Sequence, residues 1–127
     1  MPNERGIRLG ALQLRILRVL WDLEVATVSD VQQRLGQPPL AYTTVATMLR
    51  KMEDRRLVDH CEEERKFHYR AAVSRREVSR SMAGEFIDRL FGGSLTEAVS
   101  HLLESREISR EEWERLEQLI QQRKSSP

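Results

Sequence analysis

The spacing of apolar residues changes near residue 57 from a helical period to a strand-like one. In the segments 9–24, 26–36 and 40–58, apolar residues recur every three or four positions, as one buried face of a helix requires. The segment 57–73, LVDHCEEERKFHYRAAV, instead places apolar and aromatic residues on both sides of the charged centre EERK, which predicts a β-hairpin with a polar tip. Three helices followed by a hairpin is the order of a winged helix-turn-helix domain. A short strand at residues 25–27 would complete its sheet.

The remaining residues, 73–127, predict helices only. The pattern Ser-x-x-Glu, which can satisfy two backbone donors at the start of a helix, occurs three times here: at Ser74 and Glu77, Ser94 and Glu97, and Ser109 and Glu112. Gly92 and Gly93 separate the first two helices. We therefore predict a mainly α fold with a small β-hairpin: a winged-helix DNA-binding domain at 1–72 and a C-terminal helical dimerisation region at 73–127.

Composition narrows the class of protein. The chain of 127 residues has no apolar run long enough to span a membrane and no secretory signal, so we expect a cytoplasmic protein without membrane insertion. Its single cysteine excludes an internal disulfide. No phosphate loop, His-Glu-x-x-His motif or nucleophile elbow occurs, so we predict that it is not an enzyme. The net charge of +1 does not by itself imply a nucleic-acid partner.

The segment 40–58 has two faces of different chemistry. Its apolar residues predict an inner face made of Tyr42, Val45, Ala46, Leu49 and Met52. Threonine is a mediocre helix former, so the threonines on the outer face need another explanation. Hydroxyl groups can donate to phosphate, threonine methyls can meet thymine methyls, and arginine can bond a guanine edge. The alternative is an ordinary solvated surface. The candidate DNA contacts of this helix are Tyr42, Thr43, Thr44, Thr47, Arg50 and Lys51.

The predicted wing adds Arg65 and Lys66 as candidate contacts to the DNA backbone or minor groove. The residues 62–64 just before them are three glutamates, which would repel phosphate and are expected to point toward solvent or toward nearby cations. Cys61 and His68 are expected to lie opposite each other in the hairpin, but two ligands are too few for a recognised metal site, so we predict no metal and no cofactor.

The C-terminal helices carry more apolar residues than a short helical appendage can bury on itself. Packing against the N-terminal domain is one solution, and pairing with a second copy is the commoner one. A homodimer would double the DNA contacts and suit a palindromic site. The candidate dimerisation residues are Phe86, Ile87, Leu90, Phe91, Leu102, Leu103, Trp113, Leu116 and Ile120.

These segments also resemble a known family. LRILRVLWDLEVATVSDVQQRLG, AYTTVATMLRKMEDRRLVDH, FHYRAAVSRREVSRS and DRLFGGSLTEAVSHLLE are similar to the penicillinase repressor family of BlaI and MecI, over residues 9–122 and most specifically in AYTTV and FGGS. The resemblance implies a homodimeric repressor of double-stranded DNA operators with TACA/TGTA-type dyads. It places the recognition-helix residues at Thr43, Thr44, Thr47 and Arg50, with Arg65 or Lys66 in the wing.

The resemblance further implies a sensor protease as a partner, because founding members are cleaved after an Asn-Phe pair in the C-terminal region. The matching place here is His101-Leu102. The paired Cys-x-Cys motifs of copper-responsive relatives do not occur, so copper sensing is disfavoured. Two alternative functions fit the residues: a winged-helix module that docks another protein, and a metal- or thiol-responsive repressor that uses Cys61 and His68.

Overall fold

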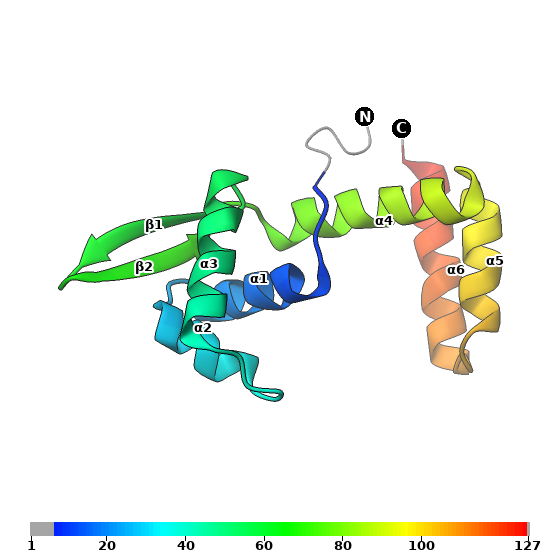
Figure 1. Ribbon diagram of the computed structural model, residues 1–127. Helices are drawn as coiled ribbons and strands as arrows, with labels where there is room; N and C mark the ends of the chain where they lie inside the picture. Colours follow the sequence, from blue (N-terminus) through cyan, green and yellow to red (C-terminus); the bar gives the residue numbers. More distant parts are fainter. Residues whose placement is uncertain (1–6, 127) are drawn as a thin grey trace. The chain divides into compact units, whose positions relative to one another are not determined.

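The structure, a computed structural model, describes residues 7–126 (Figure 1). Its elements follow the order α1 (Ala11–Leu23), α2 (Val28–Leu35), α3 (Tyr42–Asp54), β1 (Val58–Glu63), β2 (Lys66–Ala71), α4 (Arg75–Phe91), α5 (Leu95–Glu104) and α6 (Arg110–Ser125). The two strands form one antiparallel sheet. Three helices followed by the hairpin confirm the predicted mainly α, winged helix-turn-helix fold.

The chain divides into two compact units, Met1–Glu85 and Phe86–Pro127. The sequence-based division into 1–72 and 73–127 stays a prediction about functional regions. The first unit extends beyond residue 72 because the first part of α4 belongs to it. In that part of α4, Val78 and Ser81 are buried, and Met82 packs against the core of the first unit.

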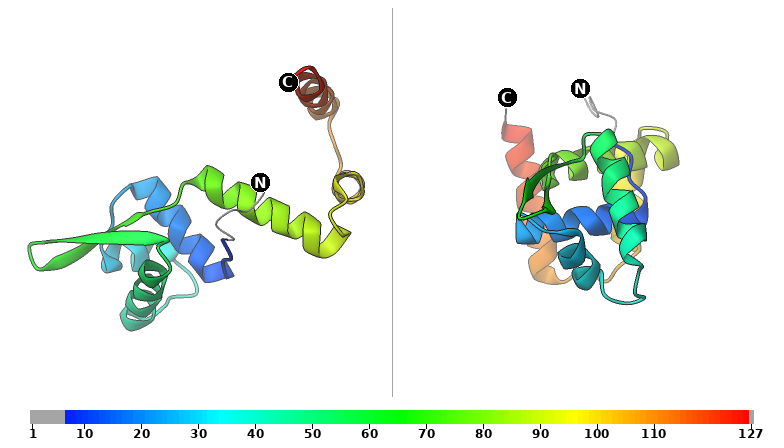
Figure 2. Two further views of the ribbon diagram at one scale, coloured as in Figure 1. Left: turned by 90° about the horizontal axis from the view of Figure 1, so that it is seen from above. Right: turned by 60° about the vertical axis from the view of Figure 1, so that its left-hand side comes forward.

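The core of the first unit lies where α1, α2, α3 and the hairpin meet. Its largest fully buried side chains come from all four elements and from α4: Ile16, Leu17, Leu20, Val31, Val45, Leu49, Met52, Val58 and Val78. On the three N-terminal helices these residues follow the helical period that the sequence shows. The hairpin projects beyond the helices in Figures 1 and 2.

Helix α2 lies inside the segment 26–36, whose apolar residues follow a helical period. At its start the Thr27 hydroxyl accepts a hydrogen bond from the Asp30 amide (3.1 Å), and the Asp30 carboxylate accepts one from the Thr27 amide (3.0 Å). The bond from the Thr27 amide favours the ionised carboxylate and, together with the Thr27 side chain, holds the pKa of Asp30 below its usual value. At the end of α2, Gly36 has a φ of 67°, a conformation that glycine adopts without strain.

The C-terminal serine caps are confirmed as well. The hydroxyls of Ser74, Ser94 and Ser109 each accept a hydrogen bond, 3.0–3.1 Å long, from the amide of the glutamate three residues later. Gly92 has a φ of 56° and Gly93 a φ of 87°, and both lie between α4 and α5 as predicted.

The hairpin has the expected register, with Cys61 opposite His68. Its two-residue loop consists of Glu64 and Arg65, whose φ angles are 52° and 66°. The strand expected at residues 25–27 is reduced to one bridge between Ala26 and Tyr69, with hydrogen bonds of 2.9 and 2.8 Å. The short strand expected there is therefore not formed as a strand: the chain enters α2 immediately after residue 27 and pairs with the hairpin at Ala26 alone.

The second unit contains the end of α4 with α5 and α6. Within residues 86–126 the only buried residue is Ala98. Phe91 contacts two other rings, those of Phe86 at 5.5 Å and His101 at 5.2 Å between centroids. In the described part of the chain, every helix falls short of the length and apolar character that a membrane crossing requires.

Candidate nucleic-acid interface

Helix α3 presents the two faces that its sequence predicts. Val45, Leu49 and Met52 are fully buried, and Ala46 is half-buried. The opposite face is exposed along the whole helix, and it consists of Thr43, Thr44, Thr47, Arg50 and Lys51. The buried face fixes the rotation of the helix about its axis, so these side chains are free to meet a ligand.

Tyr42 corrects one part of this prediction. Its side chain was expected on the inner face, but Tyr42 is 52% exposed. It is the first residue of α3, and in a helix the side chain leans back toward the N-terminus. Its exposure is compatible with the role of candidate DNA contact.

A cavity of about 490 Å³ lies between α2, α3 and the hairpin. It brings together four of the eight candidate DNA contacts: Tyr42, Arg50, Arg65 and Lys66. The threonines and Lys51 lie on the exposed face of α3 outside this lining.

The cavity is also lined by residues that the sequence did not single out as candidate contacts. These are Thr27, Val28 and Ser29 at the start of α2, and Phe67 and Tyr69 in β2. Ser29 lies inside the capping motif that runs from Thr27 to Asp30, and that motif was the available signal for a polar site.

The charges around the cavity are mixed but mainly positive. Arg50, Arg65 and Lys66 supply three cationic groups, and Glu62 supplies one carboxylate. Of the three glutamates before the tip, only Glu62 lines the cavity, while Glu63 pairs across the hairpin with Lys66. The glutamates are all exposed. The cavity can therefore attract an anionic backbone, with Glu62 as a local opposing charge.

The hairpin is tied to the end of α3 by His60. Its Nδ1 atom lies 2.6 Å from a carboxylate oxygen of Glu53, and its ring stacks on Phe67 at 4.2 Å between centroids. Next to them Tyr69 is 4% exposed, and burial, followed by the nearby Glu53 carboxylate, raises the pKa of its hydroxyl. These contacts fix the orientation of the wing relative to α3.

Cys61 and His68 were considered as a possible pair of metal ligands. The two residues are cross-strand partners, and Cys61 is exposed. Among residues 7–126, no three His, Cys, Asp or Glu side chains come together as metal ligands would.

The candidate dimerisation residues lie on the surface of the second unit or are partly covered within it. Phe86, Leu90, Leu102, Trp113 and Ile120 are exposed, with exposed fractions from 42% to 65%. The others, Ile87, Phe91, Leu103 and Leu116, are half-buried. His101 and Leu102, the candidate cleavage position, are both exposed within α5.

Comparison with known proteins agrees with this architecture. The model of the penicillinase repressor family matches residues 9–122. The penicillinase repressor of Bacillus licheniformis is 24% identical over 89% of both chains. The transcriptional regulator BlaI of Mycobacterium tuberculosis is 33% identical over 76% of this chain and 72% of its own.

The methicillin resistance regulatory protein MecI of Staphylococcus aureus is 16% identical over 93% of this chain and 97% of its own. The matches therefore include both relatives that the sequence resemblance indicated, and they extend across both compact units. The chain belongs to the penicillinase repressor family and is a transcriptional repressor of the BlaI/MecI type, not an enzyme.

Proposed function

We propose that this repressor acts as a homodimer that occupies an inverted-repeat operator of the TACA/TGTA type. The observation that carries the proposal is the exposed Thr/Arg/Lys face of α3 beside a cavity whose cations come from both α3 and the wing. A helix of this kind fits the major groove, and the wing then lies against the adjacent backbone.

The candidate residues divide by chemistry into two groups. Arg50 can form a bidentate bond with a guanine edge, and Thr43, Thr44 and Thr47 can offer methyls to thymine or hydroxyls to phosphate. Lys51, Arg65, Lys66 and the phenol of Tyr42 suit the sugar-phosphate backbone, which positions the protein without reading sequence. The first group is expected to determine which operator is bound.

The exposed apolar side chains of α4, α5 and α6 support the homodimer. A unit with one buried residue among 86–126 has little core of its own, while large side chains such as Leu90, Leu102 and Ile120 are exposed. Pairing with a second copy would remove this apolar surface from water. Two copies related by a twofold axis present two α3 helices to the two halves of a palindrome.

Cleavage by a sensor protease is proposed to release the repressor from its operator. The candidate bond between His101 and Leu102 lies inside α5, where the backbone is hydrogen-bonded. A protease that binds an extended chain needs this helix to open locally, so cleavage is expected to depend on the local stability of the second unit.

A salt titration with a duplex operator tests the proposed function. A DNA-binding repressor releases counterions, so its affinity should fall steeply and linearly in a plot of log affinity against log salt. A module that docks another protein would form no tight operator complex at any salt concentration. A metal-responsive repressor would change its affinity on addition of zinc or copper or of a chelator, and no such change is expected here.

A further inference from the structure

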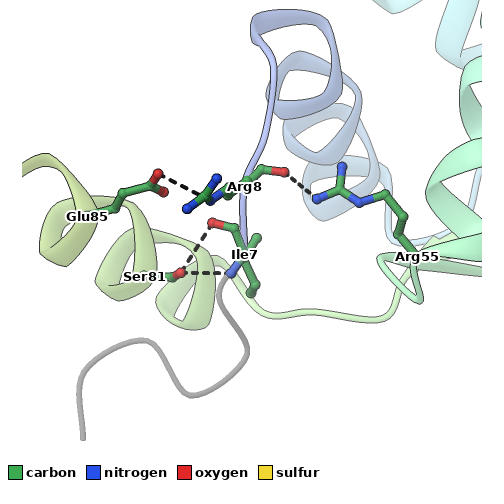
Figure 3. Close-up of polar contacts among 5 residues, drawn as sticks. All are labelled: Ile7, Arg8, Arg55, Ser81 and Glu85. Carbon is green, nitrogen blue, oxygen red and sulfur yellow. Dashed lines mark hydrogen bonds and ion pairs between the residues drawn. The ribbon is translucent and has the colours of Figure 1, made fainter. Parts of the chain in front are cut away.

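Two buried residues within 7–126 have a polar side chain, Ser81 and Tyr69, and their hydroxyls differ. The Ser81 hydroxyl accepts a hydrogen bond from the amide of Ile7 (3.1 Å) and donates one to the carbonyl of Ile7 (3.3 Å), as Figure 3 shows. Tyr69 is 4% exposed, and its hydroxyl has no hydrogen-bond partner in the same part of the chain. Because buried tyrosine hydroxyls are usually paired, this one is a donor that lacks its acceptor.

The Tyr69 hydroxyl points from β2 toward α3. Burial is the main cause of its raised pKa, and the side chains that also shift this pKa, Glu53, Arg50 and Tyr42, all belong to α3. Arg50 and Tyr42 line the same cavity of about 490 Å³ as Tyr69. Since the pKa is raised, the hydroxyl stays protonated at neutral pH and can donate a hydrogen bond into this cavity.

The charged groups around the cavity favour a ligand with one negative charge. Arg50, Arg65 and Lys66 line it, and none of them forms an ion pair within residues 7–126. The carboxylate of Glu62 in the lining and that of Asp30 at the start of α2 oppose them. This small positive excess suits a monoanion better than a polyphosphate.

The start of α2 supplies further donors to the same cavity. The amide of Asp30 is bonded to the Thr27 hydroxyl, whereas the amides of Val28 and Ser29 have no hydrogen-bond partner in the described residues. Val28 and Ser29 both line the cavity. Unpaired amides at the start of a helix favour an anion, so they act in the same direction as the Tyr69 hydroxyl.

The remaining lining is apolar or aromatic. It includes Val28, Ala46 and Phe67, and Phe67 is 43% exposed, so part of its ring is available to a ligand. A cavity of about 490 Å³ lies within the range of small-molecule sites, about 300–1,000 Å³. A single phosphate group of a DNA backbone would leave the aromatic part of this lining uncovered.

We propose that this cavity binds a small aromatic carboxylate that displaces the operator. The carboxylate accepts a hydrogen bond from the Tyr69 hydroxyl and pairs with Arg50, and the ring of the ligand lies against Phe67. The displacement rests on the proposed function, in which Arg50 contacts a guanine edge. A guanidinium that is paired with the ligand is no longer available to the DNA.

2-Naphthoate is the probe, and its binding to the full-length protein without DNA is followed by amide chemical shifts in NMR spectra. We expect shifts at the cavity lining and a Kd of about 1 mM or tighter. 2-Naphthamide has the ring without the charge, and inorganic phosphate has the charge without the ring. Both should bind about tenfold more weakly or less tightly still.

Tyr69→Phe removes only the hydroxyl. It should weaken binding of 2-naphthoate about tenfold, because a hydrogen bond to a charged group is lost. The melting temperature of the ligand-free variant should not fall, since the hydroxyl has no partner to lose. A lower melting temperature would show that the hydroxyl has a structural partner and would overturn the proposal.

Arg50→Gln and Lys51→Gln form a matched pair, because both remove one positive charge from α3 and only Arg50 lines the cavity. Arg50→Gln should weaken binding of 2-naphthoate about tenfold, and Lys51→Gln less than about twofold.

Operator release is measured by fluorescence anisotropy of a labelled duplex at constant ionic strength. 2-Naphthoate should displace wild-type protein at concentrations near its Kd, and the displacement of Tyr69→Phe should require about tenfold more.

Four results would overturn the proposal: no binding of 2-naphthoate, equal binding by the wild type and Tyr69→Phe, equal binding of inorganic phosphate, or binding that leaves the operator in place. Equal binding of phosphate would assign the cavity to the DNA backbone alone. A wild-type protein that binds no duplex would overturn the proposed function, whereas the titration without DNA would still decide whether the cavity holds the carboxylate.

Discussion

His60 and Glu53 join the wing to α3: the imidazole Nδ1 atom lies 2.6 Å from the Glu53 carboxylate, and the two side chains are 29% and 31% exposed. Since His60 also stacks on Phe67, its loss removes a polar and an aromatic contact. We expect His60→Ala to lower the free energy of unfolding by about 1 kcal/mol. Urea denaturation measures this change.

A double-mutant cycle isolates the pair itself. His60→Ala and Glu53→Ala should show a coupling energy of about 0.5 kcal/mol in the unfolding free energy. Additive effects of the two substitutions would show that the contact does not stabilise the wing.

The tip of the wing holds Glu64 and Arg65 at positive φ, a conformation that costs side chains other than glycine and asparagine about 1–2 kcal/mol. Asn-Gly is the preferred pair in a two-residue hairpin loop. We expect the double variant Glu64→Asn, Arg65→Gly to raise the free energy of unfolding by about 1 kcal/mol and yet to bind operator more weakly, because it loses the Arg65 cation.

Glu64→Asn alone is the control for this variant. It relieves part of the backbone cost and keeps Arg65, so operator affinity should not fall. A double variant that binds operator as tightly as the wild type would exclude Arg65 from the interface. A double variant that is less stable than the wild type would contradict the explanation of the loop.

Glu62 is the one carboxylate that lines the cavity with Arg50, Arg65 and Lys66. Its charge opposes the approach of phosphate, so we expect Glu62→Gln to strengthen operator binding about two- to fivefold at low salt and less at high salt. Fluorescence anisotropy at two salt concentrations measures the effect. Glu63→Gln removes the same charge from a residue outside the cavity lining and should have a smaller effect. Equal effects of the two substitutions would show that Glu62 has no special position.

Charged substitutions at apolar positions of α6 test the proposed homodimer. Ile120 is 57% exposed, so Ile120→Asp should cost the single chain little, but it would place a charge in the proposed interface. We expect monomers in sedimentation, and the same for Leu116→Asp. Both variants should lose far more operator affinity than the removal of one contact explains, because a monomer engages one half-site. The matched control is Gln118→Asp, a charge at an exposed polar position. A dimer that survives both apolar substitutions would place the interface elsewhere.

Much of this architecture follows from local sequence patterns. The helical period of Val45, Leu49 and Met52 is sufficient to predict which face of α3 is exposed. The helix caps at Thr27, Ser94 and Ser109 are local too, because each cap hydroxyl accepts its hydrogen bond from the amide of the residue three positions later. The family resemblance, which the family match confirms, adds the role of transcriptional repressor.

Features that depend on distant parts of the chain could not be predicted in the same way. Ser81 and Ile7 are 74 positions apart, and nothing near either residue indicates a partner. The exposure of Tyr42 depends on where the core ends, and periodicity does not contain that information. The cavity likewise needs α2, α3 and the hairpin in their three-dimensional arrangement before its lining can be named.

If the exposed face of α3 reads operator sequence as we propose, Arg50 is the residue whose loss should show it. The measurement is the affinity of the wild type and of Arg50→Ala for a duplex with the TACA/TGTA dyad and for a duplex with that dyad scrambled. If Arg50 bonds a guanine edge, the substitution should cost about 1–3 kcal/mol on the dyad and much less on the scrambled duplex. Equal affinity of the two proteins for the dyad would show that the exposed face of α3 does not read the operator through Arg50.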